Sequence, residues 1–138
     1  MINPKSMKKV KAISVRQPWA WLIANGYKTI ENRSRKCGYV GEVFIHASKG
    51  MTYEEYEKCL WFCMKAAPGL QLPDPVYLWR GGIIGKAMMI GCVDQSSSPW
   101  FTGPYGLVLA SAQETPFFEC RGQQAVPFNV EVPDGYGA

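Results

Sequence analysis

The sequence predicts an α+β fold, in which two or more helices flank a small and strongly bent β-sheet or β-barrel. Segments with the composition of strands outnumber those with helical periodicity. The long apolar segment 82–95 contains Gly85 and Gly91, and glycines inside a strand are typical of bulges and tight bends. A chain of 138 residues is long enough for one domain with a real core and too short for two ordinary domains.

Six segments have the β-branched and apolar composition of strands. They are residues 10–15, 28–33, 41–48, 82–95, 107–117 and 126–132. Because successive residues of a strand point to opposite faces, Thr29, Glu31 and Arg33 are expected to share one face of their strand. The same alternation predicts that His46 and Ser48 lie on one face of theirs.

Two segments have the start and stop signals of helices. The first helix is expected to begin near Pro18, which fits a first helical turn, and to end before Gly26, which fits the left-handed position after a helix. The second is expected within residues 52–69, where Thr52 and Glu55 have the spacing of a capping box. The sheet is therefore expected to have at least two helical neighbours.

The N-terminal segment predicts a basic extension instead of a targeting signal. Residues 1–9 contain three lysines but are followed by no apolar core and no small-residue cleavage site, so we expect a flexible basic arm before a single domain at 10–138. No apolar run approaches the length that spans a bilayer. These features favour a cytoplasmic protein with no membrane partner.

The cysteines argue against both a disulfide framework and a metal site. Their number is odd, and they are widely spaced: Cys37, Cys59, Cys63, Cys92 and Cys120. The only histidine is His46, so few ligands of the kind that zinc prefers are available. Small apolar side chains filling a core are the simpler interpretation. We expect no metal and no other cofactor.

Positive charge is concentrated in the first part of the chain. The net charge is +4, but residues 1–50 contain ten Lys or Arg against two Glu, and the remaining residues therefore carry a net negative charge. A one-sided positive potential attracts phosphate, which favours a nucleotide or nucleic-acid ligand. Solubility alone is the alternative explanation of a basic segment.

The segment 26–36, GYKTIENRSRK, is the strongest candidate for a binding site. It places Lys28, Glu31 and Arg33 directly after the first predicted helix, and a cluster of cations at such a position binds phosphate or carboxylate groups. The carboxylate of Glu31 can accept hydrogen bonds from the edge of a base, and Trp19 offers a ring on which a base can stack. The alternative is a structural ion-pair network that joins strand to helix.

Further candidates lie before the first helix, on the strand 41–48 and in a later loop. Arg16 and Gln17 stand at a helix N-terminus, where backbone N–H groups attract anions, although Gln17 can equally hydrogen-bond the helix start. His46 and Ser48 can contact a ligand or simply be satisfied within a strand. Tyr105 can close over a base or merely cover the core.

Several segments together resemble one family. ISVRQPWAWLIANGYKTIENR is similar to the opening of ASCH domains, which have a PUA-like fold, and the family signature Gly-x-Lys-x-x-Glu-x-Arg falls on Gly26, Lys28, Glu31 and Arg33. VFIHAS, GGIIGKAMMIGCVD and WFTGPYGLVL resemble later segments of bacterial and phage members. The resemblance implies a β-barrel surrounded by helices, with a cleft near the first helix. Residues 120–130 depart from the glycine-rich closing stretch of many relatives.

The resemblance and the residues favour an RNA- or nucleotide-binding module with a basic, Trp-lined cleft. The first alternative is an enzyme acting on RNA or a modified nucleoside, of ribonuclease or amidohydrolase type, for which Lys28, Glu31 and His46 are the catalytic candidates. The family's amide-hydrolysing branch places a Thr where this chain has Glu31, and this disfavours that chemistry. The second alternative is a protein-interaction domain presenting Tyr53, Tyr56 and Trp61.

Overall fold

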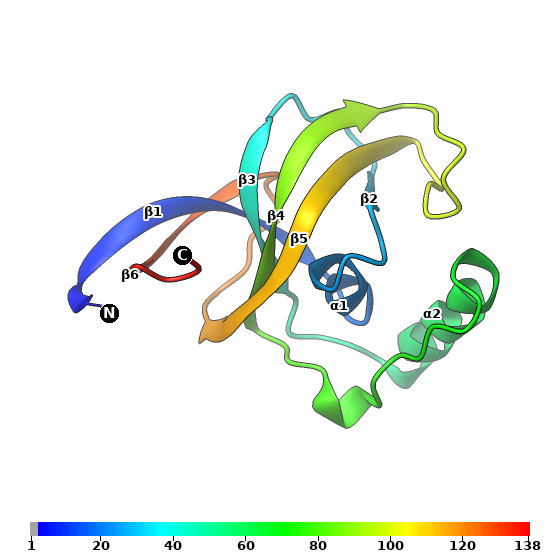
Figure 1. The fold of residues 1–138 in the computed structure, drawn as a ribbon, viewed down its shortest axis with the longest axis horizontal. Helices are drawn as coiled ribbons and strands as arrows, with labels where there is room; N and C mark the ends of the chain where they lie inside the picture. The colour runs from blue at the N-terminus through cyan, green and yellow to red at the C-terminus, as the bar shows by residue number, and fades with distance from the viewer. Residues whose placement is uncertain (1–2) are drawn as a thin grey trace.

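Hydrogen bonds join six strands into one mixed sheet in the computed structural model, which describes residues 3–138 (Figure 1). The elements are β1 (Asn3–Val15), α1 (Trp19–Ala24), β2 (Ile30–Arg33), β3 (Gly41–Ala47), α2 (Tyr53–Ala66), the 3₁₀ helix η1 (Pro75–Tyr77), β4 (Gly82–Val93), β5 (Tyr105–Glu119) and β6 (Phe128–Asp134). The strand order is β2-β5-β4-β3-β1-β6. Strands β1 and β3 run parallel, and the other neighbouring pairs run antiparallel.

The sheet is strongly curved but open, so the expectation of a closed barrel was wrong. Its two edges are β2 and β6, and a barrel would need hydrogen bonds between them. Strand β2 has only four residues, all of which pair with β5. The curvature comes from the long pair β4 and β5, whose register shifts three times, including at Gly85 and Gly91. The bends predicted at these two glycines are therefore present.

The first strand begins earlier than the sequence suggested. Residues 3–9, which we expected to belong to a flexible arm, form the first half of β1 and pair with β6. Lys8 lies opposite Val132, and Lys9 lies opposite Glu131. Strand pairing uses backbone N–H and C=O groups, which lysine has like any other residue except proline. The basic composition of residues 3–9 therefore did not indicate that they form a strand. Residues 1 and 2 of the predicted arm lie outside the described part of the chain.

Both predicted helices are present with their predicted boundary signals. Pro18 is the N-cap of α1, and Gly26 follows its end with φ +80°. At α2, the hydroxyl of Thr52 accepts a hydrogen bond from the backbone N–H of Glu55 at 3.1 Å, which confirms the predicted cap. Of the three aromatic side chains expected on the surface of α2, Tyr53 and Trp61 are exposed. Tyr56 is buried, and its hydroxyl donates a hydrogen bond to the carbonyl of Pro73.

The core has two sides because β3 is buried on both faces. Val43 and Ile45 pack with residues of α1, whereas Phe44 packs on the opposite side with residues of β6. A third cluster joins α2 to α1 through Cys59 and Leu22. All five cysteines are free. Within residues 3–138, no helix is both long enough and apolar enough to cross a lipid bilayer.

Candidate functional site

Two neighbouring hollows lie where the start of α1 meets the ends of β1, β2 and β3. The first, which we name the aromatic cavity, measures about 470 Å³ and has Trp19, Phe62 and Trp100 in its wall. The second, which we name the basic cavity, measures about 1080 Å³ and has His46 and Arg121 in its lining. The two share three lining residues, Ser14, Arg16 and Arg33. They therefore lie side by side, with these three residues in the wall of each.

Three rings hold each other in the wall of the aromatic cavity. Phe62 of α2 stacks on Trp100, with 5.6 Å between the ring centroids. The same ring contacts Trp19, at a centroid distance of 5.4 Å. The Trp19 contact is edge-to-face, at an interplanar angle of 79°. The loop that carries Trp100 is tied to β2, because the amide of Asn32 donates to the backbone carbonyl of Trp100 at 2.9 Å. These contacts fix an apolar wall before any ligand arrives.

The polar side of the aromatic cavity is a chain of three charges. Lys28 Nζ lies 3.4 Å from Oε1 of Glu31, and Arg33 Nη2 lies 3.1 Å from Oε2 of the same carboxylate. Glu31 and Arg33 come from alternate positions of β2, while Lys28 comes from the turn after α1. The structure thus brings together the three side chains of the signature, and each of them lines the cavity.

Lys28 is unusual because it is a buried lysine, with only 4% of its surface exposed. Its ammonium group also donates to the backbone carbonyl of Ile30 and lies 5.8 Å from the centre of the Trp19 ring. Burial lowers the pKa of Lys28 from its ordinary value, and the neighbouring carboxylate of Glu31 opposes this effect. The charge of Lys28 is thus held by Glu31 at the cavity wall.

Arg33 connects the two cavities. Its Nη2 donates to the backbone carbonyl of Ser14 at 2.6 Å, which fixes the guanidinium across the end of β1. Its Nε is buried and has no hydrogen-bond acceptor among the described residues. An unpaired buried donor costs about 1–3 kcal/mol of stability.

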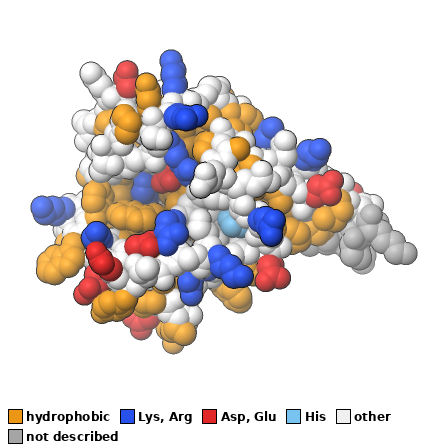
Figure 2. All heavy atoms as spheres, turned by 180° about the vertical axis from the view of Figure 1, so that it is seen from behind, with side chains coloured by type: hydrophobic (Ala, Val, Ile, Leu, Met, Phe, Trp, Pro, Cys, Tyr) orange, Lys and Arg blue, Asp and Glu red, His pale blue; other side chains and the backbone are white. Residues whose placement is uncertain are grey.

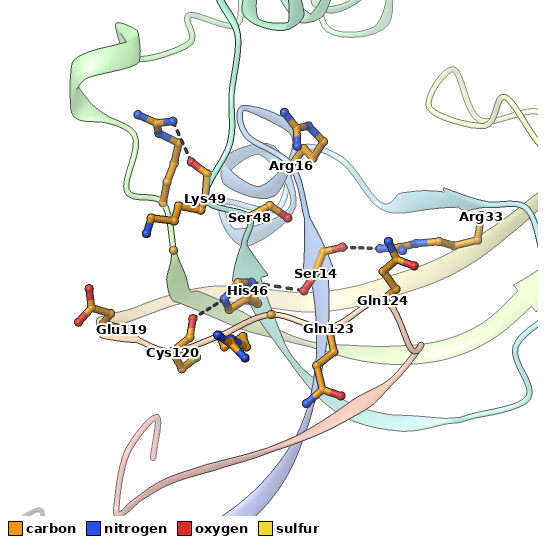
Figure 3. A pocket seen from close by; sticks show the side chains of 14 residues that line it. Ser14, Arg16, Arg33, His46, Ser48, Lys49, Glu119, Cys120, Gln123 and Gln124 are labelled. Atoms are coloured by element: carbon orange, nitrogen blue, oxygen red, sulfur yellow. Dashed lines mark hydrogen bonds between the residues drawn. The ribbon is translucent and has the colours of Figure 1, made fainter.

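The floor of the basic cavity contains His46, which is held from both sides (Figure 3). Nε2 lies 2.8 Å from the carbonyl oxygen of Cys120, so Nε2 carries a hydrogen and donates it. In the neutral ring Nδ1 is then an acceptor, and it lies 3.3 Å from the hydroxyl of Ser14. The ring therefore joins β1 and β3 to the segment 120–124 that follows β5.

The segment 120–124 lies directly on this Ser14–His46 pair because residue 122 is glycine. A Cβ atom at Gly122 would lie 2.5 Å from the hydroxyl oxygen of Ser14 and 2.6 Å from Cε1 of His46. Any side chain would push the segment away. The close approach of the backbone forms one wall of the basic cavity, from which Gln123 and Gln124 also line the hollow.

Basic side chains surround the mouth of this cavity. Figure 2 shows Lys and Arg side chains around a hollow in which the single histidine is visible. Lys49, Arg80 and Arg121 line the cavity and are exposed. None of the three forms an ion pair within the described part of the chain. Arg80 is positioned by a 2.9 Å hydrogen bond to the carbonyl of Lys49.

Arg16 and Gln17 do not match their predicted roles equally. Arg16 lines both cavities, but its guanidinium bonds both oxygens of Glu55 on α2, at 2.5 and 2.6 Å. Gln17 is only 1% exposed and faces the interior, so it offers little surface to the ligand that the sequence predicted it to contact. Its amide donates to the carbonyl of Trp79 at 2.8 Å and accepts from the N–H of Trp21 at 2.9 Å. The structural alternative, a hydrogen bond at the helix start, is the observed one.

Of the three remaining predicted residues, two line a cavity and one does not. Trp19 lines the aromatic cavity, and Ser48 lines the basic cavity beside His46. Tyr105 begins β5 opposite Arg33 and lines neither of these cavities. It is the first residue of β5, a strand between β2 and β4, instead of part of the preceding loop.

Sequence reasoning missed several lining residues. They are Asn32, Phe62 and Thr102 of the aromatic cavity, and Lys49, Arg80, Arg121, Gln123 and Gln124 of the basic cavity. The one signal for Arg121, Gln123 and Gln124 was the departure of residues 120–130 from the closing stretch of the resembled family.

Comparison with known proteins identifies the family. None of the curated proteins compared with this chain matches it. Among solved structures, a mutant of the ZmASCH protein from Zymomonas mobilis matches with a TM-score of 0.45 and 17% identity, over 79% of this chain and 74% of the other. The family model described as the ASCH domain matches residues 13–121, which include α1, β2 and all the residues that line the aromatic cavity. The chain belongs to the ASCH domain family.

Proposed function

We propose that this protein binds RNA or a nucleotide, with one base seated in the aromatic cavity. Members of the ASCH domain family are generally thought to bind RNA. The observation that carries the proposal here is the position of Glu31, a carboxylate held between Lys28 and Arg33 at the edge of a cavity walled by aromatic rings. Such a cavity offers a stacking surface and a polar edge side by side.

The dimensions of the aromatic cavity suit a single nucleoside. Its volume of about 470 Å³ lies in the range of small-molecule pockets. Stacking of a base on an aromatic side chain contributes about 1–3 kcal/mol. The rings of Trp19, Phe62 and Trp100 are already held by one another, so little side-chain ordering opposes binding.

The carboxylate of Glu31 favours bases that carry hydrogen-bond donors. An ionised carboxylate only accepts hydrogen bonds, so it matches the amino group of cytosine or adenine, or the paired N–H groups of guanine. Uracil presents a single ring N–H on that edge. The flanking cations Lys28 and Arg33 match a phosphate or a base carbonyl next to the amino group.

Binding of cytidine 5′-monophosphate and of a short cytidine oligonucleotide tests this proposal. We expect the double variant Lys28→Ala with Arg33→Ala to bind both ligands at least tenfold more weakly, and its salt dependence to be shallower. The matched control is Lys58→Ala with Lys65→Ala, two exposed lysines on α2. Unchanged binding by the cavity variant across a range of salt, with the fold intact by circular dichroism, contradicts the proposal.

An enzyme acting on RNA or on a modified nucleoside is the second candidate function. The observation that favours it is the buried Lys28, because burial lowers its pKa and so increases the fraction of the side chain in the neutral amine form, which can accept a proton or act as a nucleophile. Mass spectrometry of RNA and of N-acylated cytidine after incubation with the protein tests for cleavage. Activity that survives in the Lys28→Met variant removes this residue from any such mechanism.

A further inference from the structure

We propose that the ligand is a strand of at least two nucleotides, whose phosphate backbone passes from the aromatic cavity into the basic cavity. There it meets Lys49 and Arg121. This inference rests on the proposed function, since the first base is the one that the aromatic cavity holds. It assigns to the basic cavity the sugar and phosphates of the neighbouring nucleotides.

The adjacency of the two hollows is the first support. Ser14 and Arg33 line both, so a strand bound in one hollow has the other directly beside it. Arg33 stands at this junction with a buried Nε–H that has no acceptor within residues 3–138. The side chain of Arg33 as a whole is 22% exposed, so a phosphate oxygen can meet the accessible part of its guanidinium, and guanidinium–phosphate hydrogen bonds are among the strong, charge-assisted ones.

The second support is the charge that remains unpaired. Arg16 is neutralised by Glu55, and Arg33 contacts Glu31, so neither is fully available. Lys49 and Arg121, by contrast, are exposed cations with no ion-pair partner in the described chain. They come from segments more than seventy residues apart, yet they line one cavity.

Arg80 adds a third cation to the lining of this cavity, and it donates a hydrogen bond to the backbone carbonyl of Lys49. One acidic residue, Glu119, also lines the cavity. The excess of positive charge is what a groove for a nucleic-acid backbone requires, since such grooves bind phosphates with Lys and Arg without reading sequence.

The third support is the size and rigidity of the basic cavity. Its volume of about 1080 Å³ is more than twice that of the aromatic cavity, which already accommodates one base. The wall formed by segment 120–124 is held in place, because His46 bonds the carbonyl of Cys120 and Gly122 lies against Ser14. The exposed amides of Gln123 and Gln124 stand on that wall and can bond sugar hydroxyls or bases (Figure 3).

A mononucleotide and an oligonucleotide therefore respond differently to changes in the basic cavity. We would titrate the protein with a fluorescent cytidine hexanucleotide and, by calorimetry, with cytidine 5′-monophosphate, each at several salt concentrations. The test variant is Lys49→Gln with Arg121→Gln. The matched control is Lys58→Gln with Lys65→Gln on α2, which removes the same charge from exposed positions outside both cavities.

We expect the test variant to bind the hexanucleotide at least tenfold more weakly at physiological salt. Its slope of log affinity against log salt should fall by about 1.4, because each phosphate contact of a single strand contributes about 0.7. Binding of the monophosphate should not change, and the α2 control should resemble the parent. Inorganic polyphosphate, which has no bases, should compete poorly.

The inference is wrong if the two charge variants weaken hexanucleotide binding equally, or if polyphosphate competes as well as the hexanucleotide. It is also wrong if the hexanucleotide binds no better than the monophosphate. In each of these cases the proposed function survives as long as monophosphate binding still depends on Lys28 and Arg33. If neither ligand binds the parent protein, the proposed function itself fails and this inference fails with it.

Discussion

Nζ of Lys28 lies 3.4 Å from Oε1 of Glu31 in the wall of a cavity lined by tryptophan rings. The pair is partly removed from water, since the side chains of Lys28 and Glu31 are only 3% and 13% exposed. Removing two charges from water is costly and is only offset by good pairing and hydrogen bonds. The ligand-binding role proposed for Lys28 and Glu31 offers a reason for an ion pair kept at this cost.

Changing Glu31 to Gln should alter base preference more than affinity for phosphate. The amide keeps the size of the side chain but has one oxygen and a donor in place of a second acceptor. We expect the preference for cytidine over uridine monophosphate, measured by calorimetry, to fall about tenfold or more, since a good hydrogen-bonded base contact is worth about 1–3 kcal/mol. Glu54→Gln, at an exposed position of α2, is the control. An unchanged ratio means that Glu31 does not contact the base.

Lys28 should make stability depend on pH in the alkaline range. Because burial lowers its pKa in the folded protein, the unfolded chain binds more protons between the lowered pKa and the ordinary value of 10.5. The free energy of unfolding of the parent should therefore rise with pH through this window, relative to a Lys28→Met variant. Each unit of difference between the two pKa values corresponds to about 1.4 kcal/mol.

Urea unfolding of both proteins between pH 7 and 10.5 measures this difference. Tyr56 and Tyr136, whose burial raises their pKa, titrate equally in parent and variant and so cancel in the comparison. A difference in stability that stays constant with pH would show that Lys28 has an ordinary pKa in the folded state.

Gly122→Ala should disturb the basic cavity and leave the aromatic cavity intact. The added methyl group would lie 2.5 Å from the Ser14 hydroxyl oxygen, so the segment 120–124 must shift. Overpacking of this kind costs about 1–3 kcal/mol. We expect lower stability and weaker hexanucleotide binding, with monophosphate binding retained.

Two further variants make the Gly122 experiment specific. Gly38→Ala, at a glycine where an added Cβ meets nothing within 4 Å, should behave like the parent. Adding Ser14→Ala to Gly122→Ala removes the closest contact and should recover part of the stability. If Gly122→Ala unfolds in urea like the parent, the segment does not lie on the Ser14–His46 pair in solution.

What could be predicted from the sequence was encoded in short stretches. The boundary signals of α1 and α2 are local, because Pro18, Gly26 and Thr52 act on backbone groups within one turn. The charged triad was predicted for the same reason: Lys28 and Arg33 flank Glu31 within six residues, and the turn after α1 brings the lysine back to the strand.

What could not be predicted depends on distant partners. Gln17 is buried because it bonds the carbonyl of Trp79, 62 positions away. The basic cavity depends on His46 contacting the carbonyl of Cys120, 74 positions away. The open sheet and the long β1 likewise follow from which strands pair, and backbone pairing leaves little trace in composition.

Asn32 should be the residue that positions Trp100 in the aromatic wall. Its Oδ1 accepts from the N–H groups of Thr102 and Gly103, at 2.8 and 3.2 Å, and its Nδ2 donates to the carbonyl of Trp100 at 2.9 Å. Asn32→Ala removes all three hydrogen bonds. At about 0.5–1.5 kcal/mol for each, we expect a loss of about 2–4 kcal/mol in urea unfolding.

The conservative variant Asn32→Asp separates positioning from simple destabilisation. An aspartate keeps the acceptor for Thr102 and Gly103 but loses the donor to Trp100. Amide hydrogen exchange should therefore show the N–H groups of Thr102 and Gly103 protected in the Asp variant and exposed in the Ala variant. Affinity for cytidine 5′-monophosphate should fall in the order parent, Asp, Ala, because the ring of Trp100 is held progressively less firmly. Equal affinity in all three proteins would mean that Trp100 contributes no stacking surface to the bound base.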